Sequence, residues 1–182
     1  AGAARDGRSP VILVPETHHY CFDKAVDVLG VGRQGIVSVA VDRHFRMEVA
    51  DLEAQLDRLD RERARVLAVV AIIGTTEEGA IDPIDQIVEL RRRREESGKG
   101  SFWLHADAAY GGYLRTLTRP SRLGLGDPFV DTKVAGEVRR VPLDLPNHDA
   151  CDALAELGRA DTLAIDPPKL GYVPYPAGAV GL

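Results

Sequence analysis

The chain has 182 residues, of which 45% are hydrophobic and 28% charged, so it is long enough to form one domain with a substantial core. A formal net charge of -5 and an aromatic content of 5% argue against nucleic-acid binding, which uses a basic face or aromatic stacking platforms. No run of about 18 apolar residues is present to span a membrane, and two cysteines (Cys21 and Cys151) without metal or disulfide spacing favour the reducing cytoplasm.

The first half of the chain alternates short apolar runs with amphipathic segments. Residues 11–14 predict a strand, after which Thr17 is placed to cap a helix that ends at Gly30. A second strand is predicted over residues 36–41, and a near-continuous apolar run at residues 66–73 is typical of a parallel strand covered on both faces. Between these strands a second helix is indicated by four apolar residues at helical spacing: Val49, Leu52, Leu56 and Leu59.

A third helix is predicted to start at Asp82, a capping residue that precedes Pro83. Its buried stripe would consist of Ile84, Ile87, Val88 and Leu90. The arginine run at residues 91–94 suits the negative end of the helix dipole, and we interpret it as a solvated face rather than a nucleic-acid patch. Another strand is predicted over residues 102–107.

The remainder of the chain begins with a segment that has no sustained period. Residues 115–146 are rich in proline, glycine and mixed charge, and we expect an irregular insertion on the surface. A helix over residues 150–157 and a strand at residues 163–165 follow. Because strands alternate with helices, the fold class is predicted to be α/β, with a three-layer arrangement around a mostly parallel sheet.

The two ends of the chain suggest that it is part of a longer protein. It does not begin with methionine, and the apolar residues between 179 and 182 resemble a strand cut short. We therefore expect little activity from this segment by itself.

Lys169 is the first residue that indicates chemistry. It follows the apolar run 163–165 in a segment rich in proline and glycine, so it is expected at the carboxyl end of a buried strand, where open α/β sheets bind ligands. A desolvated lysine can lose its proton and attack carbonyl groups, including the aldehyde of pyridoxal phosphate. A lone lysine after a strand is nevertheless more often a surface-loop residue.

Three other strand ends carry weak indications of the same kind. Asp107 ends a predicted strand, where it could pair with a cation or simply cap a turn. Thr75 lies in a Gly-Thr-Thr turn, and His19 could offer an imidazole face to a planar ring. Metal binding by His18, His19 and His105 is disfavoured because no cysteine or carboxylate stands at ligand spacing.

In a parallel sheet these four groups would meet in one crevice. Pyridoxal phosphate chemistry uses a lysine for the Schiff base, an acid beside the pyridine nitrogen and an aromatic group against the ring. The combination therefore indicates a pyridoxal phosphate site, and metal binding is not expected.

Four motifs in this order resemble those of the pyridoxal-phosphate-dependent group II amino acid decarboxylases, of the aromatic-amino-acid and glutamate type. The motifs are Val-Pro-Glu-Thr-His-His-Tyr (residues 14–20), Gly-Thr-Thr-Glu-Glu-Gly-Ala-Ile-Asp (74–82), Leu-His-Ala-Asp-Ala-Ala-Tyr-Gly-Gly (104–112) and Asp-Pro-Pro-Lys with Gly-Tyr-Val-Pro-Tyr (166–175). Their wording is most similar to bacterial tyrosine decarboxylases. The resemblance implies the aspartate-aminotransferase-like fold (fold type I), of which residues 1–182 would be the central part of the large domain, without the small C-terminal domain.

The resemblance also implies roles for individual residues. Lys169 would form the Schiff base with the cofactor, Asp107 would pair with the pyridine nitrogen, and His19 would stack on the ring. Further pocket positions around the ring and substrate would be Thr75, His105 and Ala109. The implied activity is decarboxylation of an L-amino acid, tyrosine-like, to the amine and carbon dioxide, in a cytoplasmic homodimer.

The sequence departs from the family at one position. The family usually has histidine directly before the lysine, near the cofactor phosphate, whereas this chain has Pro168, which offers no donor and stiffens the turn. Two alternatives stay open at this point: another fold type I enzyme, such as an aminotransferase or lyase, or a non-catalytic fragment that serves as an interaction module.

Overall fold

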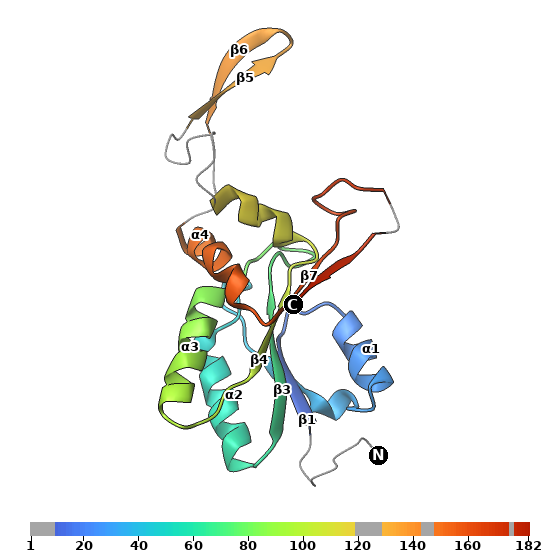
Figure 1. Cartoon of the computed structure of the whole chain (residues 1–182), viewed down its shortest axis with the longest axis vertical. Helices are drawn as coiled ribbons and strands as arrows, with labels where there is room; N and C mark the ends of the chain where they lie inside the picture. The colour runs from blue at the N-terminus through green and yellow to red at the C-terminus, as the bar shows by residue number, and fades with distance from the viewer. Residues whose placement is uncertain (1–9, 119–128, 143–147, 175–176) are drawn as a thin grey trace.

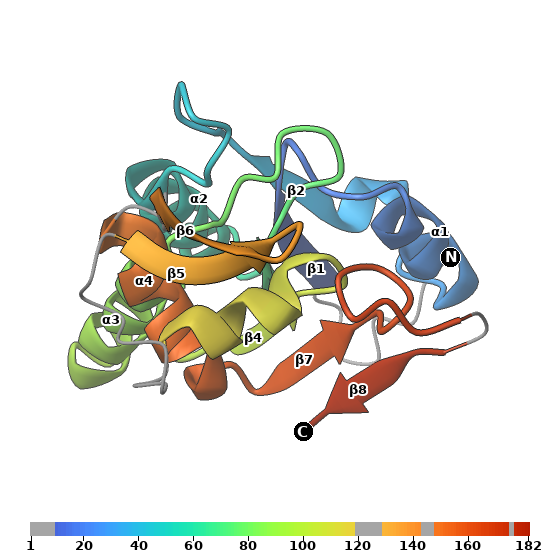
Figure 2. The same cartoon turned by 90° about the horizontal axis from the view of Figure 1, so that it is seen from above.

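The computed structural model describes residues 10–118, 129–142, 148–174 and 177–182. Within these residues, six strands form one sheet in the order β2-β1-β3-β4-β7-β8. They are β1 (Pro10–Pro15), β2 (Ile36–Val39), β3 (Arg65–Ile72), β4 (Trp103–Asp107), β7 (Thr162–Ile165) and β8 (Ala179–Gly181). All pairings are parallel except that of β8, which lies antiparallel to β7 at the sheet edge (Figure 2). The predicted mostly parallel sheet is confirmed.

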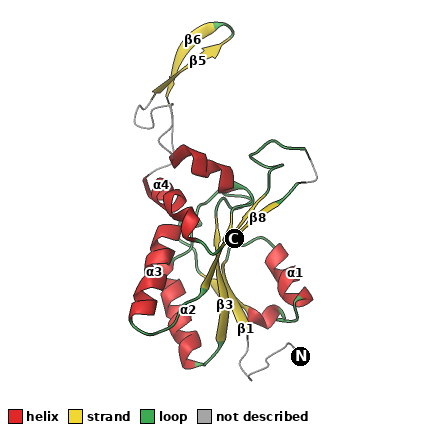
Figure 3. Ribbon diagram, viewed as in Figure 1, coloured by secondary structure: helices red, strands yellow, loops and turns green. Residues whose placement is uncertain are grey.

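Helices cover both faces of this sheet, as the prediction of three layers requires. Figures 1 and 3 show α2 (Val49–Arg61), α3 (Ile84–Glu96) and α4 (His148–Ala155) on one side and α1 (Cys21–Val28) on the other. Side chains alternate along β3, so Val69, Ala71 and Ile73 join the large core beneath α2 and α3. Val70 and Ile72 face the opposite way, toward the α1 side, where the buried cluster is smaller.

Two predicted helix caps are wrong. Tyr20 occupies the N-cap of α1 without a side-chain cap bond, so Thr17 does not cap that helix. Pro83 occupies the N-cap of α3, and Asp82 does not cap it. The fully buried Asp82 carboxylate instead accepts hydrogen bonds from the backbone N–H groups of Met47 and Ile72, both at 2.7 Å. Asp82 therefore ties the loop before α2 to the end of β3.

The segment expected to be irregular contains regular structure. η2 (Gly111–Thr118) is a 3-10 helix, and β5 (Phe129–Val134) pairs with β6 (Glu137–Pro142) as an antiparallel hairpin that projects from the body (Figure 1). The hairpin turns at Ala135 and Gly136, with φ angles of 52° and 88°. Positive φ at both turn residues matches the twist of a tight hairpin, but Ala-Gly lacks the usual Asn or Asp, so the sequence did not indicate the turn. The rest of the expected irregular segment, residues 119–128 and 143–146, lies outside the described residues.

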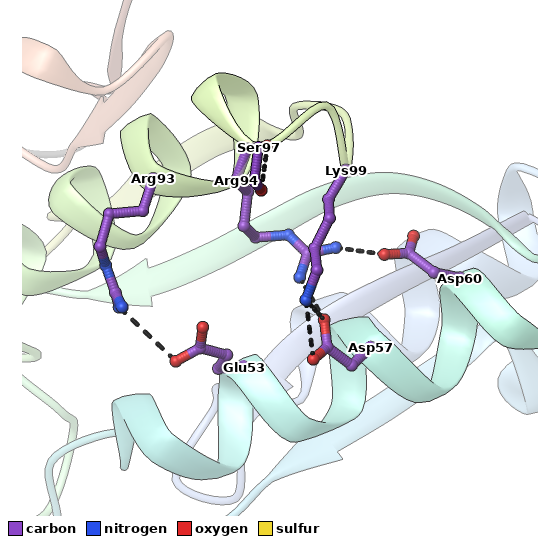
Figure 4. Close-up of polar contacts among 7 residues, drawn as sticks. All are labelled: Glu53, Asp57, Asp60, Arg93, Arg94, Ser97 and Lys99. Atoms are coloured by element: carbon purple, nitrogen blue, oxygen red, sulfur yellow. Dashed lines mark hydrogen bonds and ion pairs between the residues drawn. The ribbon is translucent and has the colours of Figure 1, made fainter.

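The arginine run of α3 is not simply a solvated face. Arg94 is 4% exposed, and its guanidinium donates to Asp57 at 2.7 Å and to Asp60 at 2.5 Å, both on α2 (Figure 4). Lys99 also reaches Asp57, at 3.0 Å. These four residues form what we call the α2–α3 clamp. Two arginines of the run do fit the original interpretation, because both are exposed. Arg92 pairs with Glu89 and Glu96 on its own helix, and Arg93 lies 3.5 Å from Glu53 on α2.

Two kinds of feature are absent from the described residues. No helix there has the length and apolar character needed to cross a membrane. No group of three or more histidine, cysteine or acidic residues in that part of the chain is arranged to hold a metal ion.

Candidate active site

A cavity of about 520 Å³ opens at the carboxyl ends of the parallel strands. This volume lies within the usual range for small-molecule sites, about 300–1,000 Å³. Its walls come from the residues that end or follow β1, β3, β4 and β7: Thr17, His19, Cys21, Phe22, Ile72, Gly74, Thr76, His105, Asp107, Ala109, Tyr110, Ala164, Asp166 and Lys169. Residues far apart in the sequence therefore meet at one edge of the sheet.

Lys169 is held at the cavity by a tight turn after β7. Asp166 N–H donates to the carbonyl of Ala109 at 3.1 Å, and Lys169 N–H donates to the carbonyl of Asp166 at 3.0 Å. The Lys169 ammonium Nζ lies 3.1 Å from Asp166 Oδ2, and its side chain is 35% exposed. The amine is thus oriented by a neighbouring carboxylate while it stays accessible to a ligand.

Asp107 faces the same cavity from the end of β4. Its Oδ1 accepts a hydrogen bond from Ala109 N–H at 3.2 Å, which restrains the orientation of the carboxylate. The prediction that Lys169 and Asp107 converge on one crevice is confirmed.

The chain packs closely behind this part of the cavity. Gly111 N–H donates to the carbonyl of Ile73 at 2.7 Å, and a Cβ at position 111 would come within 2.3 Å of that oxygen. Glycine is required there, because a larger residue would push the segment after β4 away from β3.

The two adjacent histidines have different positions. His19 lines the cavity, and its Nδ1 accepts a hydrogen bond from Cys21 N–H at 3.3 Å. His18 instead pairs with the Pro15 carbonyl at 2.8 Å and with Asp23 Oδ2 at 3.3 Å, so it braces the loop. His19 is thus the histidine of this pair that lines the cavity, and its stacking on a cofactor ring stays a prediction.

His105 also lines the cavity, as expected, and pairs through Nδ1 with the Thr162 hydroxyl at 2.8 Å. Burial lowers the pKa of His105, an effect that the negative charge of Asp107 partly offsets. The imidazole is therefore biased toward its neutral form at physiological pH.

Thr75 was predicted to face the cavity, but it is not among the residues that line it. The residue is buried, and its hydroxyl accepts a hydrogen bond from Ala80 N–H at 3.0 Å inside the loop after β3. Its neighbours Gly74 and Thr76 line the cavity instead. The φ of 90° at Gly74 bends the chain here, and the sequence does not reveal which of two consecutive threonines such a bend turns outward.

Sequence reasoning assigned no role to two cavity residues near the lysine. Asp166 stands three positions before Lys169, a spacing that would bring the two together in any tight turn. Cys21 lies two positions after His19. Partial burial raises the pKa of the Cys21 thiol, with a further increase from the nearby charge of Asp107 and a smaller opposing effect from Lys169. The pKa of the Cys21 thiol therefore responds to the charges of Asp107 and Lys169.

Comparison with known proteins identifies the family of the chain. The pyridoxal-dependent decarboxylase conserved domain matches residues 6–129, more than half of the chain. The chain belongs to the pyridoxal-dependent decarboxylase family. It is 39% identical over 173 residues to an L-tyrosine decarboxylase of Enterococcus faecium and 38% identical over 179 residues to one of Levilactobacillus brevis. Each alignment covers 92% of this chain but only 28% and 27% of the relative, so the chain spans just over a quarter of their length.

A solved structure has the same fold. The crystal structure of mouse CSAD superimposes with a TM-score of 0.67 at 26% identity, covering 97% of this chain and 30% of that one. The type I fold expected from the motifs is confirmed.

The cavity has the groups that the family's cofactor requires. It combines an accessible lysine amine, a carboxylate fixed by a backbone amide and an imidazole, with small residues at Gly74 and Ala109 that leave room for a flat ring. These residues fit pyridoxal phosphate.

Proposed function

We propose that the full-length protein is a pyridoxal-phosphate-dependent decarboxylase that converts a tyrosine-like L-amino acid to its amine and carbon dioxide. The observation that carries this proposal is that Lys169 and Asp107 line one cavity at the carboxyl ends of the sheet. The bound cofactor supplies an aldehyde that condenses with amines and a ring that accepts the electron pair released when the substrate carboxylate leaves.

Five of the cavity residues would then have distinct roles. Lys169 would hold the cofactor through its amine, with Asp166 orienting that amine from 3.1 Å. Asp107 would keep a proton on the pyridine nitrogen, because a nearby carboxylate favours the charged form of a base. His19 would cover one face of the ring, and His105, biased toward neutrality, would add no competing positive charge.

The choice of a tyrosine-like substrate is supported by two relatives. Both are L-tyrosine decarboxylases and are aligned with nearly all of this chain. A substrate screen with the full-length protein tests this choice: tyrosine, DOPA, tryptophan, glutamate and diamino acids would be compared by kcat/KM. Preference for an acidic or diamino acid would overturn it.

We further propose that the enzyme works as a homodimer in the cytoplasm. The support is the resemblance to dimeric family members and a composition without a disulfide framework. Light scattering of the purified full-length protein would detect the dimer, whereas a monomeric mass would contradict it.

Reductive trapping tests the central assignment. The full-length protein is incubated with pyridoxal phosphate, reduced with borohydride and digested, and we expect a pyridoxyl group on the peptide that carries Lys169. Lys169→Ala should lose this adduct and the associated near-visible absorbance band. Lys133→Ala, on the exposed hairpin, is the matched control and should keep both. An unchanged band in Lys169→Ala would show that the cofactor lysine is elsewhere.

Analysis of the products separates decarboxylation from other reactions of the same fold. Equal amounts of amine and carbon dioxide are expected from the preferred substrate. A keto acid as the main product would indicate an aminotransferase instead.

A further inference from the structure

Thr17 has a hydroxyl group that the described residues leave without a partner. Its Oγ1 is buried, and none of the residues that the structure describes lies within hydrogen-bonding distance of it. The residue lies in the loop between β1 and α1 and lines the 520 Å³ cavity together with His19, Asp107 and Lys169.

The surrounding loop uses its own polar groups in other ways. The Pro15 carbonyl accepts hydrogen bonds from His18 N–H at 3.0 Å and pairs with His18 Nδ1 at 2.8 Å. The first turn of α1 is served by His19, whose carbonyl accepts from Phe22 N–H and whose Nδ1 accepts from Cys21 N–H. Thr17 is therefore not needed as a helix cap, which is the role that its place in the sequence indicates.

A buried hydroxyl without a partner is unfavourable, so its persistence in a cavity wall calls for an explanation. A threonine hydroxyl can donate one hydrogen bond, and pyridoxal phosphate carries phenolic and phosphate oxygens that accept. We infer that Thr17 binds the cofactor by donating a hydrogen bond to one of these oxygens. This inference rests on the proposed function, because it takes the cofactor to occupy this cavity.

Thr17→Val tests the inference, since valine has nearly the same shape but no hydroxyl. In the full-length protein we expect Thr17→Val to raise the Kd for pyridoxal phosphate roughly 3- to 10-fold, measured by titration of the near-visible absorbance. Thr17→Ser keeps the hydroxyl and should bind within about twofold of the wild type. Equal binding by Thr17→Val and the wild type would overturn the inference.

The cofactor-free protein gives a second readout that does not depend on activity. Because valine removes a buried polar group that has no partner, the unfolding midpoint of Thr17→Val without cofactor should rise by about 1–3 °C. A fall in that midpoint would show that the hydroxyl is already satisfied, by water or by other parts of the chain, and would contradict the inference.

The two hypotheses can fail separately. If the wild type shows no Lys169-dependent adduct, the proposed function is wrong. If the wild type forms the adduct and Thr17→Val binds equally well, the function stands and only the role of Thr17 is wrong. At saturating pyridoxal phosphate, Thr17→Val should still form the Lys169 adduct, because the hydroxyl affects affinity and not the bond itself.

Discussion

The α2–α3 clamp and the cavity both bring charged groups together, but they treat those groups differently. In the clamp, Arg94 is 4% exposed and its guanidinium is directed at Asp57 and Asp60 (Figure 4). In the cavity, Lys169 is 35% exposed and its ammonium lies 3.1 Å from the Asp166 carboxylate, and the Thr17 hydroxyl has no partner among the described residues.

This difference distinguishes groups that stabilise the fold from groups that remain available to bind a ligand. Packed helices are stable when the chain pairs every buried charge, because an unpaired buried charge lowers the free energy of unfolding. Binding is served when polar groups are positioned by the fold yet remain available. Changes in the clamp should therefore alter stability, and changes in the cavity should alter function.

Asp107→Asn should have the largest functional effect. The neutral amide cannot hold a proton on the pyridine nitrogen, so turnover of the full-length protein should fall by about 1,000-fold. The amide oxygen can still accept the hydrogen bond from Ala109 N–H, so the unfolding midpoint should move little. Steady-state kinetics and thermal unfolding of the same preparation measure both. Normal turnover would contradict the assigned role of Asp107.

Removal of the acidic half of the clamp should have the largest effect on stability. Asp57→Asn with Asp60→Asn leaves the buried Arg94 charge without an ionic partner and should lower the free energy of unfolding by about 3–4 kcal/mol. Arg94→Met should cost less, about 1–2 kcal/mol, because the two carboxylates that remain are partly exposed and can be hydrated. Urea unfolding measures both variants.

Arg92→Met is the matched control for the clamp, since Arg92 pairs with Glu89 and Glu96 on the exposed surface of the same helix. Its free energy of unfolding should stay within about 0.5 kcal/mol of the wild type. An equal loss from Arg92→Met and Arg94→Met would remove the distinction between the clamp and the surface pairs.

Asp82 extends the comparison to a buried acid whose hydrogen-bond donors, among the described residues, are two backbone amides. Burial raises its pKa to about 7, although backbone N–H groups of Ile72 and Met47 favour the ionised form. Because the folded pKa exceeds the unfolded value of about 3.9, the stabilising contribution is complete below about pH 4 and is lost as the pH rises through 7.

The pH dependence of Asp82→Asn tests this sign. Between pH 5 and 8 the wild type should lose roughly 2.5 kcal/mol of unfolding free energy relative to Asp82→Asn. Unfolding by urea at several pH values provides the measurement. A wild type that gains stability relative to Asp82→Asn over this range would show that the two amide donors outweigh burial.

The sequence predicted the parts of this comparison that depend on chain order. Apolar runs separated by helical periods indicate a parallel sheet, and a parallel sheet brings its carboxyl ends together, so Lys169, Asp107 and His19 could be placed in one crevice. The two carboxylates that pair with Arg94, and the Met47 amide that donates to Asp82, lie more than 30 positions away in sequence, and no local pattern identifies them. Local sequence rules also do not predict which way a loop side chain points. Thr76 rather than Thr75 lines the cavity, and Thr17 lines the cavity instead of capping α1.

Cys21 offers the smallest effect and a direct test of the cavity's charges. Partial burial and the carboxylate of Asp107 raise the pKa of its thiol, while Lys169 opposes this increase. Alkylation requires the thiolate, so the pH midpoint of Cys21 labelling should lie above the ordinary thiol value. Without cofactor, this midpoint should fall in Asp107→Asn and rise in Lys169→Ala, as followed by mass spectrometry of the labelled peptide.

Opposite shifts in these two variants would place both charges beside one thiol without any reference to catalysis. If neither variant moves the midpoint, Asp107 and Lys169 do not act on Cys21 together, and the single cavity on which the functional half of the comparison depends would be wrong.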